Sequence, residues 1–185
     1  MRIISGKYKG RMFDPGKNFK ARPTTDFAKE SLFNILANNI DFEKVKFLDL
    51  FSGTGSISYE FLSRQCKDVT LVELNFKHIQ FIKSVMKELN EIAKVYRADV
   101  FKFIENHKIK YDIIFADPPY DHPRFGEIPG SILRNNLLAE NGILIIEHSK
   151  QYQFNEIPGF YDLRKYGSVH FSFFHQTASP DVSLS

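Results

Sequence analysis

The stretch from Lys46 to Ser56 constrains the fold more than any other part of the chain. A short apolar run containing Asp49 leads into a turn with glycine at positions 53 and 55. Residues 56–64 then carry apolar side chains at helical spacing, so the stretch predicts a strand, a glycine turn and a helix. This sequence of elements is typical of the opening of a βαβ unit, where glycines let the backbone approach a ligand and the helix N-terminus favours negative charge.

The glycine turn departs from the usual dinucleotide-binding fingerprint. Ser58 stands where that fingerprint has its third glycine, which argues against NAD and leaves room for a smaller nucleotide-like ligand. Asp49 ends a strand that should be buried, so its carboxylate needs a partner such as a turn N–H group or a ligand amine. The alternative is that the glycines serve only the sterics of a strand-to-helix turn.

The rest of the chain alternates between strand and helix patterns. The apolar pattern predicts a helix after Pro23 and further helices over 76–90, 100–106 and 130–139, with strands at 69–72, 94–96, 111–116 and 142–147. Residues 160–166 and 169–176 alternate around Gly167 and predict a terminal antiparallel hairpin. The sequence therefore predicts an α/β fold with a mostly parallel sheet, helices on both faces and ligands outside the carboxyl ends of the strands.

Length and composition predict one domain in a reducing compartment. The 185 residues suit a single unit, which we divide into a basic N-terminal hairpin extension (1–22), a catalytic core (23–176) and a loose tail (177–185). Cys66 is the one cysteine, which excludes a disulfide framework. No apolar stretch reaches membrane-spanning length, so we expect a cytoplasmic protein with no membrane partner.

The first 22 residues concentrate positive charge. They hold seven basic side chains and one acid, whereas the remainder of the chain holds 18 basic and 21 acidic groups. Residues 2–4 and 7–13 carry strand formers around Ser5-Gly6, which predicts a hairpin with Lys7, Lys9 and Arg11 on one face. Such a segment is typical of a protein with a polyanionic partner, and the alternative is a solubilising arm.

Four acids each follow a predicted strand: Asp49, Glu73, Asp99 and Asp117. Because the carboxyl ends of parallel strands meet at one edge of a sheet, we expect these side chains to share a ligand site. Glu73 lies 24 residues after Asp49, close to the spacing at which an acid reaches a ribose diol. Each acid could instead cap the following helix, and for Asp99 taken alone that interpretation is favoured.

The tetrapeptide Asp117-Pro118-Pro119-Tyr120 is the most specific motif. Two prolines fix the backbone and remove two N–H donors, which leaves a rigid set of acceptors beside an aromatic ring. Such a site suits a flat group that donates hydrogens, for example an exocyclic amine on a nucleobase, and the alternative is a rigid loop that closes a strand. No nucleophile elbow or Walker motif occurs, and the histidines lack metal-ligand spacing, so no metal is expected.

Six segments of the chain follow the pattern of a known family: residues 2–11, Arg22–Asp26, Lys29–Leu36, Leu48–Gly55, Leu62–Arg64 and Asp117–Tyr120. On these segments the chain resembles the RsmD family of small-subunit ribosomal RNA guanine-N2 methyltransferases. The matching segments extend from residue 2 to about 176, and the N-terminal ones are more specific than the glycine turn. Gln65-Cys66 in place of a Gly-Ala pair, Ser52 in place of Ala and a short segment after Tyr120 are departures from the family pattern.

The resemblance implies a class I fold that uses S-adenosylmethionine, with a seven-stranded, mostly parallel sheet ending in an antiparallel hairpin. Carried over by position, Gly53 and Gly55 would pass the methionine part of the cofactor, with Asp49 near its amine. Glu73 would bind the ribose hydroxyls and Asp99 the adenine amine.

On the substrate side, the resemblance implies that Asp117 and Pro118 accept hydrogens from the guanine N2 amine while Tyr120 stacks on the base. The implied partner is 16S ribosomal RNA, either free or within an assembling small subunit, and we expect a monomer. Two alternatives stay open: methylation of a DNA adenine or cytosine amine, and a non-catalytic RNA-binding protein that keeps the cofactor fold. The residues expected to bind RNA are Arg2, Lys7, Lys9, Arg11 and Arg22.

Overall fold

The computed structural model describes residues 1–16 and 25–176, and Arg22 and the predicted tail lie outside these ranges. Strands and helices alternate along the chain as the sequence pattern predicts. The elements are α1 (Asp26–Ala37), β1 (Lys46–Leu50), α2 (Ser56–Ser63), β2 (Asp68–Glu73), α3 (Phe76–Leu89), β3 (Lys94–Arg97), α4 (Val100–Asn106), β4 (Tyr111–Ala116), the 3₁₀ turn η1 (Phe125–Glu127), α5 (Ile128–Arg134), β5 (Leu138–His148), β6 (Phe160–Tyr166) and β7 (Val169–His175).

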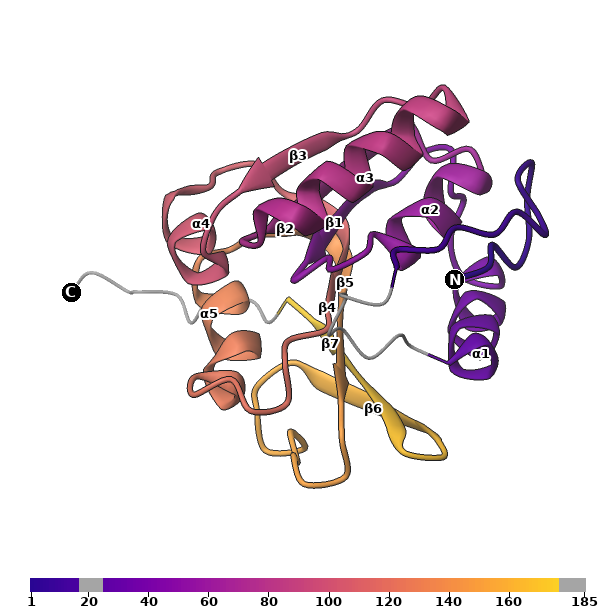
Figure 1. Cartoon of the computed structure of the whole chain (residues 1–185). Helices are drawn as coiled ribbons and strands as arrows, with labels where there is room; N and C mark the ends of the chain where they lie inside the picture. Colours follow the sequence, from indigo (N-terminus) through magenta and orange to yellow (C-terminus); the bar gives the residue numbers. More distant parts are fainter. Residues whose placement is uncertain (17–24, 177–185) are drawn as a thin grey trace.

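The strands of the described residues form one seven-stranded sheet in the order β3-β2-β1-β4-β5-β7-β6 (Figure 1). The first five strands in this order are parallel, and β7 pairs antiparallel with both β5 and β6. This confirms the predicted parallel sheet with a terminal antiparallel hairpin. The strand order reverses between β1 and β4, which is the position where open α/β sheets bind ligands.

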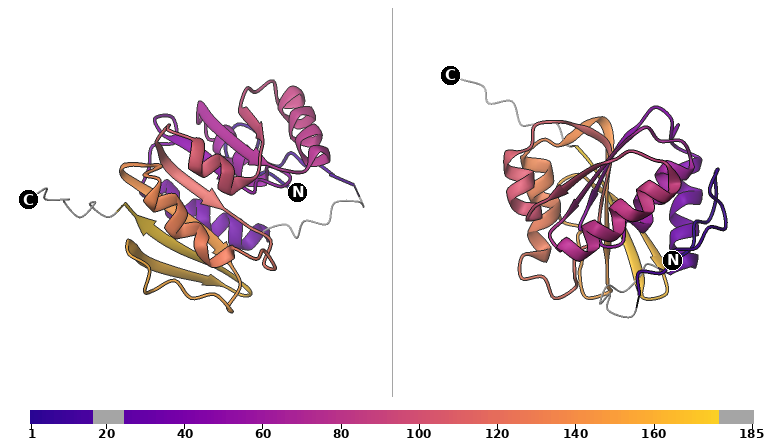
Figure 2. Two further views of the ribbon diagram at one scale, coloured as in Figure 1. Left: turned by 90° about the vertical axis from the view of Figure 1, so that its left-hand side faces the viewer. Right: turned by 45° about the horizontal axis from the view of Figure 1, so that its top comes forward.

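Helices cover both faces of the sheet, because successive strand residues point to opposite sides. On β1 and β4, Phe47 and Phe115 pack with α1, α2 and α3, whereas Leu48 and Ile114 pack with α4 and α5. Figure 2 shows the two helical layers on either side of the twisted sheet. Among the described residues, no helix combines the length and the apolar character that crossing a bilayer requires.

The predicted N-terminal hairpin is wrong in its detail. A single antiparallel bridge joins Arg2 to Met12, and the residues between form turns with no paired strands. Some backbone donors bond within the segment, and others bond to α2: Lys7 N–H donates to Ser63 O at 2.8 Å, and Ile4 N–H to Glu60 Oε1 at 2.7 Å. The chain therefore forms a loop clamped onto α2, and Lys7, Lys9 and Arg11 do not share a strand face.

The boundaries around α5 also differ from the prediction. The helix ends at Arg134, because Asn135 and Asn136 form a turn in which Asn136 adopts a positive φ of 55°. Strand β5 then begins at Leu138, which pairs with Tyr111 ahead of a register shift in β4. The helix expected over 130–139 is thus shorter, and the strand expected at 142–147 is longer at both ends.

Candidate functional site

The fold brings the four predicted acids to the same edge of the sheet. Asp49 lies between Leu71 of β2 and Phe115 of β4 in the strand register, one residue before the end of β1. Glu73 ends β2, Asp117 directly follows β4, and Asp99 follows β3. The parallel topology therefore places the four residues at the carboxyl ends of the strands, where Glu73 lies close enough to Asp49, and Asp49 to Asp117, to raise the pKa of its neighbour.

The glycine turn between β1 and α2 is bent by three residues with positive φ: Phe51 at 59°, Gly53 at 53° and Gly55 at 80°. A phenylalanine in this region is strained, and such strain is typical of functional sites. A Cβ on Gly55 would lie 2.9 Å from the Tyr59 hydroxyl, so no side chain fits there. A Cβ on Gly53 would meet nothing nearer than Phe51 O at 3.9 Å, so this glycine faces open space.

Asp49 carries a buried carboxyl group that accepts a hydrogen bond from helix α2. Its side chain is 2% exposed, and its Oδ2 accepts a hydrogen bond from the Ser58 hydroxyl at 2.6 Å. Burial raises the pKa of Asp49 to about 7, against the lowering effect of the Ser58 hydrogen bonds, and the nearby Glu73 adds to the rise. The site therefore holds a carboxyl group that a cationic ligand would drive to its ionised form.

Glu73 connects β2 to the glycine turn. Its Oε2 accepts from the Gly53 N–H at 2.8 Å, and its Oε1 accepts from the Asn75 N–H at 2.7 Å. His78 Nδ1 lies 3.5 Å from Oε2, and because a carboxylate offers about four acceptor positions, some capacity remains for a ligand. Asp99 caps α4, where its Oδ1 accepts from the Lys102 N–H at 3.0 Å.

The tetrapeptide after β4 lies beside the glycine turn, because the Asp117 N–H points at Leu50 O, 3.4 Å away. Pro118 is buried, and Asp117 and Tyr120 are half-buried. Burial raises the pKa of Asp117 well above its usual range, and the negative charges of Glu147 and Asp49 add to the rise. The Tyr152 hydroxyl donates to Tyr120 O at 2.7 Å and fixes the end of the loop.

Sequence reasoning missed three polar groups of this site. Glu147 is 3% exposed and lies within reach of Asp117, and the rule that found the other acids, an acid at a strand end, would have found it. Ser58 looked like a missing glycine but supplies the hydrogen bond to Asp49. The Tyr59 hydroxyl is buried beside Gly55 with no hydrogen-bond partner among the described residues, and the sequence carries no signal for that.

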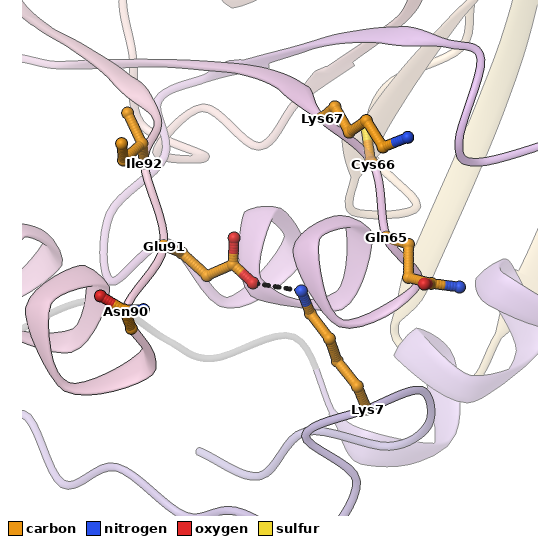
Figure 3. A pocket seen from close by; sticks show the side chains of 7 residues that line it. All are labelled: Lys7, Gln65, Cys66, Lys67, Asn90, Glu91 and Ile92. Atoms are coloured by element: carbon orange, nitrogen blue, oxygen red, sulfur yellow. Dashed lines mark ion pairs between the residues drawn. The ribbon is translucent and has the colours of Figure 1, made fainter.

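Lys7 and Arg11 lie away from this edge, whereas Arg2 lies near it, because the Lys29 ammonium donates both to Arg2 O and to the hydroxyl of Ser56 at the start of α2. Lys7 Nζ forms an ion pair with Glu91 Oε1 at 2.5 Å, in a surface cavity of about 340 Å³ beyond the C-terminal ends of α2 and α3 (Figure 3). Arg11 pairs with Glu88 at 2.5 Å, and Arg2 pairs with Asp26 at 3.1 Å. Because helices run back against their strands, this cavity is at the opposite end of α2 from the glycine turn.

The strand order, the antiparallel β7 and the acid-lined glycine turn define the class I methyltransferase fold. Solved structures agree: the Escherichia coli protein yhhF superposes with a TM-score of 0.82 at 27% identity, covering 97% of this chain and 99% of that one. Coclaurine N-methyltransferase, solved with N-methylheliamine and SAH, superposes with a TM-score of 0.51 at 24% identity over 68% of this chain and 36% of its own, and shows the fold alone.

The family model described as conserved hypothetical protein 95 matches residues 1–175. Ribosomal RNA small subunit methyltransferase D of Haemophilus influenzae is 35% identical over 81% of this chain and 79% of its own length. The protein of the same name from Buchnera aphidicola subsp. Baizongia pistaciae is 34% identical over 80% and 75%. The chain belongs to this family, the RsmD family, as its motifs predict.

Proposed function

We propose that this chain transfers a methyl group from S-adenosylmethionine to the N2 amine of a guanine in small-subunit ribosomal RNA. One observation carries the proposal: a rigid, donor-poor tetrapeptide, Asp117–Tyr120, adjoins a glycine turn backed by the buried carboxyl group of Asp49. The names of the family relatives support ribosomal RNA as the substrate. The guanine N2 amine fits an acceptor site, because it presents two hydrogens and a flat ring for stacking.

The residues of the turn fit a cofactor with an amine, a ribose and an adenine. Asp49 would hold the methionine amine, and the open space beside Gly53 leaves room for close approach of the backbone. Glu73 has acceptor positions left for the ribose hydroxyls, and Asp99 at the start of α4 would reach the adenine amine. The cofactor supplies an activated methyl group on a sulfonium centre.

The protein's own contribution is to orient the acceptor nitrogen. The Asp117 carboxylate and the Pro118 carbonyl accept the two amine hydrogens, which draws the nitrogen lone pair out of conjugation with the ring. Tyr120 stacks on the base, and its position is fixed by the hydrogen bond from Tyr152. Catalysis then rests on proximity and preorganised electrostatics: as the bond from nitrogen to the methyl group forms, the bond from sulfur to that group would break with its electron pair left on sulfur, and the amine proton would then pass to water. The base must be unstacked, which suits looped RNA.

Replacing Glu73 by alanine is expected to weaken cofactor binding rather than the chemical step. A carboxylate that accepts hydrogen bonds from a ribose diol contributes roughly 1.5–3 kcal/mol, so the dissociation constant should rise about tenfold to a hundredfold. Part of this loss reflects the released Gly53 and Asn75 N–H groups. Isothermal calorimetry gives the dissociation constant, and saturating cofactor should restore most of the rate. An unchanged dissociation constant would leave Glu73 with the turn-holding role alone.

Cofactor affinity is expected to rise with pH between about 5.5 and 7.5, because only ionised Asp49 pairs with the methionine amine. Its pKa of about 7 means that affinity should fall by up to about tenfold per pH unit below neutrality. The Asp49→Asn variant should bind more weakly and without this pH dependence, whereas Asp117→Asn should keep it. A wild-type affinity that is constant over this range would contradict the assignment of Asp49.

Without cofactor, ionisation of Asp49 lowers the stability of the folded protein. The folded protein binds the Asp49 proton more tightly than the unfolded chain, whose carboxyl group has the ordinary pKa of 3.8. The contribution of Asp49 to stability therefore decreases as pH rises from about 4 to about 7, and a bound amine offsets this loss.

The proposal also includes binding of RNA by the basic N-terminal residues, although Lys7, Lys9 and Arg11 do not share a strand face as the sequence predicted. Lys9 is exposed, whereas Lys7, Arg11 and Arg2 would exchange carboxylate partners for phosphate. Lys7 and Arg11 are separated from the glycine turn, so they would form a docking surface and not a part of the reaction centre.

Transfer of labelled methyl groups tests the proposal. Purified protein receives labelled S-adenosylmethionine with free small-subunit RNA, isolated small subunits, large-subunit RNA or DNA, and the nucleosides are then separated by mass spectrometry. We expect label in N2-methylguanosine from small-subunit material. Label in methyladenine or methylcytosine of DNA would support the DNA alternative, and no label in any substrate would support a non-catalytic binding protein.

A further inference from the structure

A second cavity opens at the reaction edge of the sheet, between the β5–β6 loop and the β6–β7 hairpin. It has a volume of about 230 Å³ and is lined by His148, Lys150, Tyr152, Gln153, Phe154, Asn155, Phe160, Leu163, Lys165, His170 and Ser172. Figure 1 shows this loop and hairpin together beyond the end of β5, on the side of the sheet away from α3.

The strand register places three of its polar groups in one row. His148 of β5 lies opposite His170 of β7, which lies opposite Lys165 of β6. The same register puts Asp117 beside Glu147, one strand away from this row. Neighbouring strands are about 4.8 Å apart, so the row extends on the order of 10–15 Å sideways from the tetrapeptide. This is the scale of a nucleotide next to the one being modified.

The cavity also shares its wall with the reaction site. Tyr152 lines the cavity and donates its hydroxyl hydrogen to Tyr120 O at 2.7 Å. Its ring stacks on Phe125 with centroids 3.8 Å apart and planes at 11°, which holds the tyrosine in place. A molecule seated in the cavity therefore contacts a residue that positions the end of the tetrapeptide.

The lining is cationic and contains no acid. Lys150 and Lys165 are exposed, and neither forms an ion pair with a carboxylate of the described residues. In the other cavity, by contrast, Lys7 is already paired with Glu91. The reaction site itself gathers Asp49, Glu73, Asp117 and Glu147, whose field repels a polyanion. A phosphate chain that approaches Asp117 needs cations close by, and these two lysines supply them.

The rest of the lining suits a sugar and a base. Gln153 and Asn155 offer amide donors and acceptors, and Tyr152 and Phe160 offer aromatic surface. His148 is engaged inside the protein, where its ring nitrogens lie 2.9 Å from Ser149 O and 2.8 Å from the Ser172 hydroxyl. It shapes the floor of the cavity, while His170 stays half-buried at the opening.

We propose that this cavity binds a nucleotide of the RNA strand flanking the methylated guanine, with Lys150 and Lys165 neutralising its phosphate. The inference rests on the proposed function and extends it, because it names the second contact that presents the target base. Such phosphate contacts carry no base information, so the site should fix the position of the strand whatever the neighbouring sequence.

The test compares two double variants of equal charge. Lys150→Ala/Lys165→Ala removes the two cations, and Lys108→Ala/Lys110→Ala removes two lysines at the opposite end of β4. Binding of a small-subunit RNA fragment and of an unrelated single-stranded RNA is measured at several salt concentrations. The first variant should lower the slope of log affinity against log salt by about 0.7, the value for one neutralised phosphate of a single strand, and weaken binding about fivefold at 0.1 M salt.

The control variant should change the slope little, and both variants should keep the cofactor dissociation constant, which also shows that they are folded. With RNA as the varied substrate, the first variant should raise KM while kcat stays near the wild-type value. Equal shifts in the two variants would mean that net charge alone is responsible, and an unchanged slope would remove the site; either result overturns the inference. A wild-type protein that methylates no RNA would overturn the proposed function instead, and the salt slopes would still decide whether the cavity holds phosphate.

Discussion

The Asp117→Ala variant should lose at least about a hundredfold in the rate of methyl transfer and bind the cofactor as the wild type does. Loss of one preorganised acceptor that acts on the reacting group typically costs this much. In the proposed site Asp117 faces the base, whereas Asp49 and Glu73 face the cofactor. Calorimetry with S-adenosylmethionine and single-turnover transfer to RNA separate the two effects.

Unfolding would not explain such a loss. The pKa of Asp117 is raised by burial and by the nearby charges of Glu147 and Asp49, so removing this carboxyl group relieves repulsion. We therefore expect the variant to be at least as stable as the wild type. The exposed Asp41, in the loop before β1, gives a matched Asp→Ala control with unchanged activity. A parallel loss of cofactor affinity and rate would mean that Asp117 belongs to the cofactor site.

The Glu60→Ala variant should lose about 3–5 kcal/mol of stability, a large share of the total for a domain of this size. Glu60 is fully buried on α2 and lies 3.3 Å from the ammonium group of Lys29, which is 1% exposed on α1. It also accepts from the Ile4 N–H and pairs with Arg64. Its loss leaves Lys29 as an uncompensated buried charge and releases the N-terminal loop from α2.

Urea unfolding measures this effect. The exposed Glu105→Ala on α4 serves as the control and should stay within about 0.5 kcal/mol of the wild type. Burial already lowers the pKa of Lys29 against the raising effect of Glu60, so the Glu60→Ala variant should lower it further. The variant should then regain stability as pH rises, because the unfolded chain binds the lysine proton more tightly than the folded one. A loss below about 1 kcal/mol would show that the network is not a main tie between the loop, α1 and α2.

The sequence predicts the core of the fold because its signals are local. Apolar periodicity distinguishes strands from helices, and the alternation of the two requires a parallel sheet with its acids at one edge. The N-terminal loop shows where this reasoning fails. Residues 7–13 alternate like a strand, yet the N–H groups of Lys7 and Tyr8 bond to Ser63 at the end of α2, a contact that no local pattern reveals.

In the candidate site, too, the sequence predicts some residues and not others. Asp49, Glu73 and Asp117 were predictable because each lies at or next to the carboxyl end of a strand, and Glu147 fits the same rule. The cavity with Lys150 and Lys165 was not predictable, since it depends on the register of β6 and β7 against β5. His170 alternates with phenylalanines along β7, and no sequence pattern indicates that it lines this cavity.

The central claim is that the modified group is the N2 amine of a guanine in small-subunit ribosomal RNA. Mass-spectrometric mapping of ribosomal RNA from cells with and without this protein tests it most directly, with cells that carry the Asp117→Ala variant as a third sample. The account predicts one N2-methylguanosine in the small-subunit RNA that is present with the wild type and absent from the other two samples. Identical modification maps in all three samples, or a difference confined to another base or to DNA, would contradict it.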